Sequence, residues 1–454
     1  MKVDLVVIGA GPAGMAAAVQ ARAQGLSVAV LDEQAAPGGQ IWRNVEAAGA
    51  AKLGAAYAEG AAAVAAFRAC GADYLPGMSV WQVEADGRVF ASDGVAARVV
   101  TGERVVVAVG AQERAVPIPG WTLPGVMGVG AAQILLKAGG VVPDRPVWIA
   151  GQGPLVLLYM TQLLAAGGRI AGWLDTGRPG AWRAAAARVP GALAGWRQLA
   201  KGLGWRLALR GVRRVGGVSA VEALGAGRVE RLRWRVGGVW AEAPCELLLL
   251  HEGVVPAGHM GLALGVTQEW DAAQGCFRPV LDAWGRTDRA RILIAGDCGG
   301  IGGAVAAGLR GRLAGLAAAV DLGRAGAAAA ERVAAPWRAA LRVEAGVRGL
   351  LDVLFAPAPW VLVPGDGVVL CRCEGVTAGA VRAAVATGAQ GPNQVKAFTR
   401  AGMGPCQGRI CGLAVAQVIA AARGVAPSTI GLARVRPPLK PVTLGELAGL
   451  AADS

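Results

Sequence analysis

The chain has 454 residues, of which 54% are hydrophobic and 17% are charged, with a formal net charge of +14. This length and composition exclude a disordered chain and predict two or three domains, and no apolar run reaches the roughly 20 residues that a transmembrane helix needs. Arginine is spread along the sequence without a Lys/Arg block, so we interpret the charge as a solvated basic surface and expect no nucleic-acid partner.

The N-terminus contains a strand, glycine turn, helix and strand in succession. Residues 3–8, VDLVVI, predict a buried strand, and GAGPAG opens an Ala-rich helix that runs to about residue 24. A second strand, LSVAVLDE, then ends in acidic residues. Asp4 interrupts the apolar segment that would make a signal peptide, so we expect a mature cytosolic start.

This unit predicts a dinucleotide-binding site. Gly9 permits the tight turn, Gly11 lets the backbone approach a pyrophosphate, and Gly14 lets the helix pack on the strand. The N-terminus of the helix offers N–H groups to the anion. Asp32 is the residue expected to bind the ribose hydroxyls, with Glu33 as the alternative.

Two further stretches belong to the same predicted site. In APGGQIWR the Gly-Gly pair before Gln40 ends at Gly39 and lets a loop pass close to ligand phosphates. The segment RVVVAVGAQERAVPIPG predicts a strand that ends at Gly110, followed by a Pro-rich exit. This exit resembles the crossover at which the chain of two-dinucleotide flavoproteins leaves the FAD domain.

A second glycine fingerprint follows the strand at residues 147–150. Gly151 and Gly153 are present, but Val156 stands in place of the third glycine, and the next strand ends at Asp175. Because the third glycine serves helix–strand packing, we expect these two elements to lie farther apart or to pack differently. A functional NAD(P) pocket and a purely structural Rossmann unit both remain open.

The segment ARILIAGDCGGIGGA predicts a strand that ends at Gly296 and Asp297, before a Gly-rich helix start. It resembles the second FAD motif of the same flavoproteins, in which the Asp contacts the ribityl and phosphate groups. Cys298 is interpreted as a buried thiol without a redox role, because no partner cysteine is near in sequence.

The C-terminal part predicts a small helical module. Residues 324–356 have helical periodicity with a break expected near Pro336, and APAPWVLVPGDG predicts a linker. Thr377 and Asn393 are the expected N-caps of two helices, and a third helix follows. In the tail, Thr443 and Glu446 have the spacing of a capping box, and we expect this arm to pack on a neighbouring subunit or on its own chain.

Four of the eight cysteines form a pattern. Cys371 and Cys373 make a C-x-C pair, and Cys406 and Cys411 make a C-x4-C pair, with 32 residues between the two pairs. C-x-C is too tight for the usual zinc knuckle, and the glycines around the second pair let backbone N–H groups approach sulfur. The pattern favours a [2Fe–2S] cluster, with zinc or no metal as alternatives.

This cysteine set resembles the [2Fe–2S] domain named after bacterioferritin-associated ferredoxin. Together with GAGPAG, DEQAAPGGQIWR, HEGVVP, AGDCGGIGGA and RPPLKPVTLGEL, the whole chain resembles the α subunit of heteromeric hydroxyproline, proline and opine dehydrogenases, a group that includes the B subunit of hydrogen cyanide synthase. The resemblance implies FAD at the motifs of Gly9 to Gln40 and at Asp297, and it implies that the four cysteines hold the cluster. Trp42 stands where a Tyr is usual.

The resemblance also implies that an amine is oxidised on a separate β subunit of the D-amino-acid-oxidase type, so we expect no catalytic residue in this chain. An FMN at the subunit interface and a small ferredoxin-like γ subunit are further expectations. His251 and His259, the only histidines, are interpreted as structural hydrogen-bonding residues. The expected location is cytoplasmic, peripheral to the inner membrane through the electron acceptor. The alternative function is a stand-alone NAD(P)H-dependent FAD/[2Fe–2S] oxidoreductase.

The predicted fold class is α/β, a two-dinucleotide-binding-domain flavoprotein with a small C-terminal helical [2Fe–2S] domain. An inserted Rossmann-like domain interrupts the FAD domain, and a helical linker and an arm flank the cluster domain. The predicted limits are 1–118 with 256–322 for the FAD domain, 119–255 for the insertion, 323–365 for the linker, 366–425 for the cluster domain and 426–454 for the arm.

Overall fold

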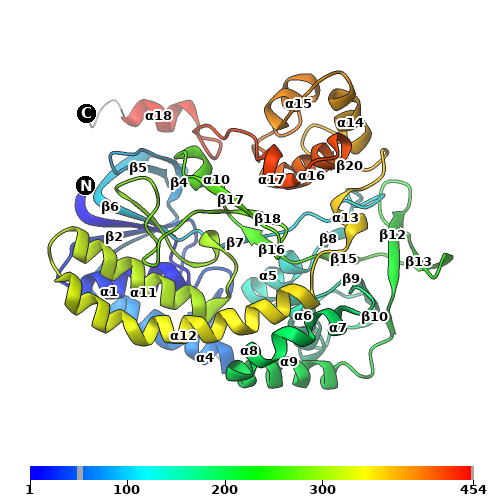
Figure 1. Ribbon diagram of the computed structural model, residues 1–454, viewed down its shortest axis with the longest axis horizontal. Coiled ribbons are helices and arrows are strands. Elements are labelled where there is room, and N and C mark those ends of the chain that lie inside the picture. The colour runs from blue at the N-terminus through cyan, green and yellow to red at the C-terminus, as the bar shows by residue number, and fades with distance from the viewer. Residues whose placement is uncertain (49–54, 451–454) are drawn as a thin grey trace.

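A computed structural model describes residues 1–48 and 55–450 of the chain. Figure 1 shows two α/β bodies, each with its own sheet, and a small helical domain that lies above them. The last segment of the chain returns from this helical domain to the first body (Figure 1). The predicted α/β fold class is therefore confirmed.

Within the described residues, the first body is built on a seven-stranded sheet of order β3-β2-β1-β6-β5-β4, with β19 paired to β6. Strands β1, β2, β3, β6 and β19 pair in parallel, and β4 and β5 extend the sheet antiparallel. The strands are β1 (Lys2–Ile8), β2 (Val28–Asp32), β3 (Asp73–Pro76), β4 (Ser79–Val83), β5 (Arg88–Ser92), β6 (Ala97–Val107) and β19 (Ile292–Ile294). This arrangement places the carboxyl ends of β1, β2, β6 and β19 at one edge, where ligands bind in open α/β sheets.

Glycines allow two helices of the first body to pack backbone against backbone. A Cβ at Gly311 or Gly315 of α11 would overlap the carbonyl oxygen of Ala13 or Ala17 of α1. The helices on this sheet and beside it are α1 (Pro12–Ala23), α2 (Val45–Ala48), α4 (Ala55–Ala69), α10 (His259–Ala263) and α11 (Ala304–Asp321), with the 3-10 turn η3 (Gly296–Gly299) before α11. The close contact brings the first and last segments of the body together, so both predicted FAD motifs lie at one edge.

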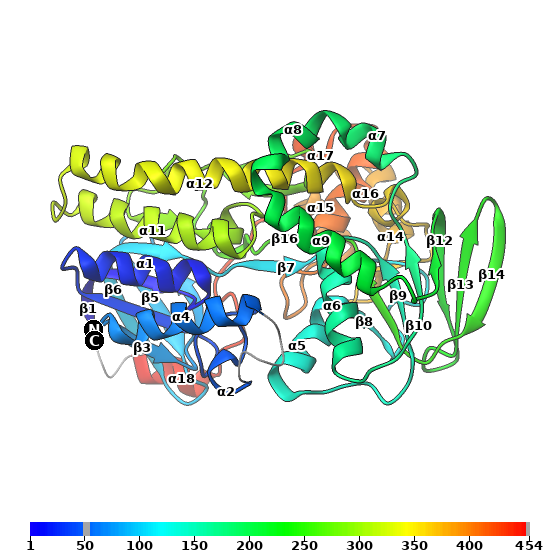
Figure 2. The same cartoon turned by 90° about the horizontal axis from the view of Figure 1, so that it is seen from below.

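The second body contains, among the described residues, a five-stranded parallel sheet of order β11-β10-β9-β15-β8. A three-stranded antiparallel sheet of β12, β13 and β14 projects from its end (Figure 2). The strands are β8 (Val126–Gly128), β9 (Val147–Gly151), β10 (Ile170–Asp175), β11 (Arg214–Val215), β12 (Val218–Leu224), β13 (Arg231–Val236), β14 (Val239–Pro244) and β15 (Leu248–His251). The helices are α5 (Val129–Gly139), α6 (Pro154–Ala165), α7 (Ala181–Ala185), η1 (Ala186–Arg188), α8 (Val189–Ala192), η2 (Leu193–Gly195) and α9 (Trp196–Ala208).

Two antiparallel strands, β7 (Ala111–Glu113) and β16 (Val254–Pro256), connect the two bodies. The buried Arg114 follows β7 and donates to three backbone carbonyls, those of Glu252 at 3.1 Å, Gly275 at 3.1 Å and Gln274 at 2.6 Å. These bonds tie the crossing to the hairpin of β17 (Gln268–Asp271) and β18 (Cys276–Pro279). The predicted domain boundaries at 118/119 and 255/256 lie close to this crossing, and we propose them as the domain limits.

Helix α12 (Ala327–Leu354) corrects one prediction, because it continues through Pro336 without a break. Proline removes one helical hydrogen bond and is costly in an isolated helix, by about 3 kcal/mol. Here α12 packs along α11 and against α7 and α8, so tertiary contacts compensate for the lost bond. The predicted linker after it contains the short helix α13 (Pro359–Leu362).

The C-terminal module is a helical domain with its own apolar core. Its elements are β20 (Val369–Cys371), β21 (Val376–Thr377), α14 (Ala378–Ala386), α15 (Pro392–Thr399), α16 (Gly412–Arg423) and α17 (Pro427–Ile430). Thr377 caps α14 by accepting a 3.2 Å bond from the Ala380 N–H, as predicted. The prediction for Asn393 was wrong: Gly391 precedes α15, and the Asn393 side chain instead accepts a 3.0 Å bond from the Arg434 N–H.

The C-terminal arm packs on the first body of its own chain. The side chains of Val435 and Leu439 are buried in the core beneath the sheet, and the Leu439 N–H donates to the Trp81 carbonyl at 2.6 Å. Thr443 and Glu446 form the predicted capping box at the start of α18 (Leu444–Leu450), with a 2.7 Å bond from the Thr443 N–H to the Glu446 carboxylate. The arm thereby links the helical module to the first body.

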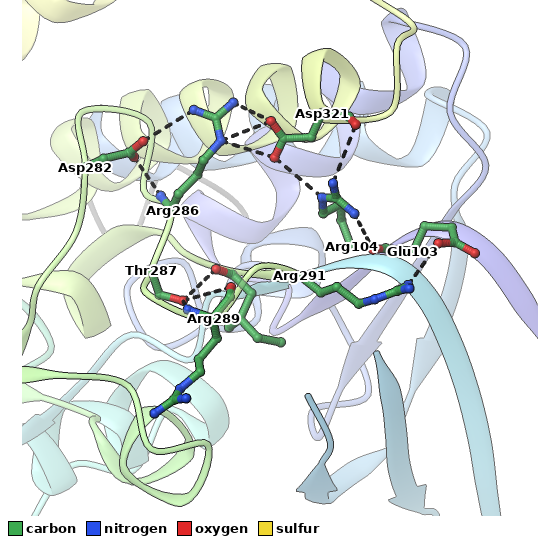
Figure 3. Close-up of polar contacts among 9 residues, drawn as sticks. Glu103, Arg104, Asp282, Arg286, Thr287, Arg289, Arg291 and Asp321 are labelled. Carbon is green, nitrogen blue, oxygen red and sulfur yellow. Dashed lines mark hydrogen bonds and ion pairs between the residues drawn. The ribbon is translucent and has the colours of Figure 1, made fainter. Parts of the chain in front are cut away.

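Ion pairs hold the segment that returns to the first sheet before β19 (Figure 3). Arg286 contacts the carboxylate of Asp321, at the end of α11, at 2.5 Å and that of Asp282 at 3.3 Å. Arg104 of β6 reaches the same Asp321 carboxylate at 3.5 Å. Such partly exposed pairs contribute about 1 kcal/mol or less each, so they position this segment more than they stabilise the fold.

A search of residues 1–48 and 55–450 finds no helix with the length and apolar character required to cross a bilayer.

The helix contact predicts opposite effects for two glycines of α11. Gly311→Ala should lower the free energy of unfolding by roughly 1–3 kcal/mol, because its Cβ has no space against α1. Gly308→Ala is the matched control: its Cβ meets open space, so helix propensity should raise stability by up to about 1 kcal/mol. Denaturant unfolding of both variants checks this, and equal effects would contradict the contact.

Candidate functional site

The first fingerprint adopts the backbone geometry that a dinucleotide requires. Gly9 has φ +100°, and a Cβ there would meet the Ala108 carbonyl oxygen at 2.6 Å. Gly14 lies so close to the Gly9 carbonyl that a Cβ would overlap it. Helix α1 starts after Gly11 without a side-chain cap, so its first N–H groups are free to bind a ligand anion.

The Gly-Gly loop crosses directly over the start of α1. A Cβ at Gly39, which has φ +58°, would lie 2.9 Å from Gly11 Cα. The loop is fixed by a 2.8 Å bond from the Gly38 N–H to the Ala10 carbonyl. Side chains at these positions would fill the space between loop and helix, so the glycines keep a cradle for a phosphate group.

Asp32 lies at the end of β2 beside this cradle and is 6% exposed. Its carboxylate accepts bonds from the backbone N–H groups of Ala10 and, at 2.7 Å, of Gln34. Burial raises the pKa of the Asp32 carboxyl, although these bonds oppose the shift. Glu33, the alternative candidate for binding the ribose hydroxyls, instead forms an ion pair with Lys440 of the C-terminal arm.

The loop that carries Gln40 is held by a lysine that sequence reasoning missed. Lys137 of α5 is 4% exposed, and its Nζ donates to the Ile41 carbonyl at 3.1 Å and to the Gln40 carbonyl at 3.4 Å. Burial lowers the pKa of Lys137 to about 8. Its partners are backbone atoms 96 and 97 positions away, so no local motif marks this contact.

The second predicted FAD motif lies at the same sheet edge. The Asp297 carboxylate accepts bonds from the N–H groups of Gly302 at 2.9 Å and Gly303 at 3.0 Å, at the start of α11. A carboxylate there is favoured by the partial positive charge of the helix N-terminus. Gly110 has φ +73° and accepts a 3.1 Å bond from the Ala257 N–H, so it joins the crossing strands to this edge.

A half-buried arginine contacts this motif and was missed from the sequence. Arg310 of α11 donates to the carbonyls of Gly296, at 3.4 Å, and Gly300. Burial lowers the pKa of its guanidinium. Cys298 is buried nearby, its thiol donates to the backbone carbonyls of Ala295 at 3.2 Å and Val107 at 3.4 Å, and burial raises its pKa to about 11. These contacts agree with its interpretation as a structural thiol.

The four patterned cysteines come together as two pairs of thiols. The Sγ atoms of Cys373 and Cys406 are 3.7 Å apart. Cys371 and Cys411 are both 1% exposed, and burial and the neighbouring Cys371 thiol raise the pKa of Cys411. Cys373 is exposed, so one pair lies at the surface and the other lies in the core of the helical domain.

The glycines around the second cysteine pair bring backbone close to sulfur, as predicted. The Gly402 N–H points at the Cys371 Sγ at 3.4 Å. A Cβ at Gly404 would lie 3.1 Å from the Cys373 Sγ and would overlap the Cys373 Cβ. Larger residues at these positions would force the two cysteine-bearing loops apart.

In the described part of the chain, no group of three or more His, Cys, Asp or Glu side chains has the geometry that holds a metal ion. The donor chemistry nevertheless fits a [2Fe–2S] cluster, in which each iron takes two thiolates and the two irons share sulfides. Two thiol pairs on two glycine-lined loops are the donor set that this cluster takes.

The loop between Cys406 and Cys411 is attached to the first body. Gln112 of β7 donates to the Arg409 carbonyl at 2.6 Å, and His259 of α10 donates to the Gln407 carbonyl at 3.1 Å. Burial lowers the pKa of His259 to about 4, so the ring is neutral at pH 7 and its Nε2 carries the proton.

The arm holds the same loop from the other side. Gln407 donates to the Pro438 carbonyl at 2.5 Å, and Arg409 donates to the Leu439 carbonyl. Sequence reasoning missed these contacts, because side chain to carbonyl bonds between distant segments leave no local pattern.

The second fingerprint has the glycine geometry but a different packing. Gly151 and Gly153 have φ +157° and +99°. Val156 is fully buried in the core between the sheet and α6, so the extra side chain fills the space that a third glycine would leave. Asp175, at the end of β10, contacts Arg214 at 2.6 Å and the Gly177 N–H at 2.9 Å.

The segment after α12 lies over this second fingerprint. Gln152, which is 2% exposed, donates to the Ala356 carbonyl at 2.8 Å and to the Glu252 carboxylate at 3.1 Å. The Ala358 N–H donates to the same carboxylate at 3.0 Å, and burial raises the pKa of Glu252. A Cβ at Gly153 would already meet the Phe355 ring at 4.0 Å. The chain itself therefore occupies the position above the glycine turn.

Both histidines make hydrogen bonds within the protein. His251 Nδ1 lies 2.6 Å from the Glu113 carboxylate, which also accepts a 3.0 Å bond from the Gly130 N–H. His259 holds the cysteine loop as described above.

Two family models match the chain. Residues 3–139 match a pyridine nucleotide-disulphide oxidoreductase model, and residues 370–451 match the sarcosine oxidase A3 domain. The chain is 42% identical to the A subunit of opine oxidase from Rhizobium meliloti (strain 1021) over 98% of both chains. It belongs to the family of opine oxidase A subunits.

Other relatives agree with this membership. The HcnB subunit of hydrogen cyanide synthase from Pseudomonas aeruginosa is 33% identical over the full length of both chains. The crystal structure of L-proline dehydrogenase from P. horikoshii matches 98% of this chain and 79% of its own, with a TM-score of 0.74 at 21% identity. This structure confirms the predicted fold, and the family establishes the chain as a flavin-binding subunit of a heteromeric oxidase.

Lys137 predicts a pH dependence of stability. Its pKa is about 8 in the folded chain and near 10.5 when exposed, so the unfolded chain binds more protons between these values. Stability should therefore rise as pH increases from about 8 to 10.5, by roughly 2–3 kcal/mol. Denaturant unfolding at several pH values should show this rise in the wild type relative to Lys137→Met. A parallel pH profile of the two proteins would contradict the burial of the ammonium group.

Proposed function

We propose that this chain is the electron-transferring flavin and iron–sulfur subunit of a heteromeric dehydrogenase or oxidase. The substrate would be an amino acid or opine with a secondary amine, such as hydroxyproline, proline, octopine or nopaline, and it would be oxidised on a β subunit of the D-amino-acid-oxidase type. Electrons would pass through flavin to a [2Fe–2S] cluster and on to an acceptor.

The observation that carries this proposal is the attachment of the cysteine loop to the flavin domain. His259 of α10 binds this loop, and Gly258 and Gly261 of the same segment line a small cavity with Cys298, next to Asp297. The segment of residues 258–261 therefore contacts both the cysteine loop and the cavity beside the second FAD motif. Such an arrangement suits transfer between two redox groups in one chain.

The residues expected to hold each group are distinct. FAD would lie along Gly9, Gly11, Gly14, Asp32 and Asp297, and the cluster on Cys371, Cys373, Cys406 and Cys411. When bound, a flavin takes up electron pairs and a [2Fe–2S] cluster passes single electrons. The protein supplies the phosphate cradle, the carboxylates and the fixed loop positions.

Partner subunits are part of the proposal. The only two histidines of the chain are engaged in hydrogen bonds that hold the fold, which supports amine oxidation at a site on another chain. An FMN at the interface with the β subunit, a ferredoxin-like γ subunit and a cytoplasmic location near the inner membrane are further parts of this proposal.

We also propose that the second Rossmann-like fold is structural. The contacts of Gln152 and Glu252 with residues 356–358 support this, because they hold that segment over the glycine turn, where a bound NAD(P) would lie. The stand-alone NAD(P)H-dependent oxidoreductase is therefore the weaker alternative.

The cluster assignment predicts a spectroscopic result. Purified protein should show flavin absorbance and, after reduction, the electron paramagnetic resonance signal of a [2Fe–2S] cluster. Cys373→Ser and Cys411→Ser should lose most of this signal while flavin absorbance stays. Cys70→Ser, a half-buried cysteine outside the set, is the control. Zinc in place of iron by elemental analysis, or a signal that survives both substitutions, would disprove the assignment.

The segment that lies over the second glycine fingerprint predicts how the purified protein responds to pyridine nucleotides. Under anaerobic conditions NADH and NADPH should leave the flavin oxidised, whereas dithionite should bleach it. Stopped-flow absorbance measures both. Rapid bleaching by either nucleotide would favour the stand-alone oxidoreductase and would refute a structural role for the second fold.

A further inference from the structure

One stretch of the second body carries positive charge without any acidic residue. Between Asp175 and Glu222 the sequence contains no Asp or Glu. The basic residues in this stretch are Arg178, Arg183, Arg188, Arg197, Lys201, Arg206, Arg210, Arg213 and Arg214. The spread of arginine over the whole chain conceals this local excess of positive charge.

The same stretch exposes a row of large apolar side chains on α9. Trp196, Leu203 and Leu207 are 61%, 60% and 58% exposed. Their spacing of seven and four residues places them on one face of the helix. Leu193, just before the helix, is 58% exposed and extends the apolar surface. Isolated exposed leucines are ordinary, but a tryptophan and two leucines in one row are not.

The helix is anchored to the body by its other faces. Trp205 and Leu209 pack in the core of the second body, and Leu199 packs in the cluster formed with α12. Gln198 donates to Glu344 of α12 at 2.7 Å. The exposed row is therefore held outward on a fixed helix.

Cations flank the apolar row. Arg197 lies over the Trp196 ring at 5.7 Å, and Lys201 lies over the Trp205 ring at 5.4 Å. Within residues 1–48 and 55–450, none of the cations Arg197, Lys201, Arg206 and Arg210 forms an ion pair with a carboxylate. A helix with Trp and Leu on one face and Arg and Lys beside them is typical of helices that lie in a membrane interface.

We propose that α9 binds an anionic lipid surface, with Trp196, Leu203 and Leu207 entering the interface and the flanking cations meeting lipid phosphates. A protein partner is less well matched, because a protein surface mixes charges of both signs, whereas this stretch carries cations alone. Cations without a single intervening acid match a uniformly negative surface.

The position of α9 is compatible with electron transfer to or from partners. In Figure 1, α9 lies at the lower rim and the cysteine-bearing domain with α14 to α16 lies at the top. Figure 2, seen from below, brings α9 to the front of that domain. A lipid surface on α9 would therefore lie on the side of the molecule opposite this domain.

Vesicle sedimentation tests the proposal with the full-length, flavin-containing protein. The wild type should sediment with vesicles of phosphatidylglycerol and phosphatidylcholine in equal parts, but not with phosphatidylcholine alone. About 0.5 M NaCl should release it, because salt screens the attraction. Leu203→Ser/Leu207→Ser should weaken the partitioning about tenfold or more, and Arg197→Gln/Lys201→Gln about twentyfold.

Matched variants control for general effects. Val95→Ser/Val239→Ser removes apolar side chains that are more exposed, at 85% and 72%, and Arg98→Gln/Arg436→Gln removes cations elsewhere. Both variants should bind vesicles as the wild type does. Thermal unfolding of all variants verifies that they fold. Absence of wild-type binding to the anionic vesicles, or full binding by both α9 variants, would overturn the proposal. Loss of a co-expressed partner subunit from the α9 variants, without vesicle binding by the wild type, would assign the surface to protein assembly instead.

Discussion

The close contact of α1 with α11 is the constraint on which the flavin domain depends. Gly311 and Gly315 let two helices from opposite ends of this domain approach until one backbone touches the other. This contact fixes the N-terminus of α1, with Gly11, beside the turn that carries Asp297. An inserted domain of well over a hundred residues separates these motifs in the sequence, and helix packing together with the pairing of β19 to β6 brings them to one sheet edge.

The cysteine loop depends on the flavin domain in turn. Gln112 of the crossing strand β7 and His259 of α10 donate hydrogen bonds to carbonyls of this loop, and the loop bonds to the arm on its other side. Lys440 of the same arm also pairs with Glu33 beside the FAD cradle. The arm therefore contacts segments of both predicted redox sites and joins the helical domain to the flavin domain.

The second Rossmann-like fold has kept the nucleotide-binding backbone while its surroundings serve other contacts. Val156 fills the helix–strand interface, and Gln152 and Glu252 bind the segment after α12. The outer face of the same body carries the basic and apolar helix α9. A fold of this type can thus serve as a spacer that positions the flavin and cysteine domains.

Local patterns determined the strands, the glycine turns, the Thr377 cap and the Thr443 and Glu446 capping box, because turns and caps depend on residues only a few positions apart. The predicted FAD and cluster residues likewise follow from motifs and spacing. Tertiary structure alone decided the path of α12 through Pro336, the different role of Asn393 and the contacts of Lys137, Arg310 and Gln112. These features depend on backbone carbonyls and packing surfaces supplied by distant segments. Because every residue has a carbonyl group, the sequence does not indicate which carbonyl a side chain will contact.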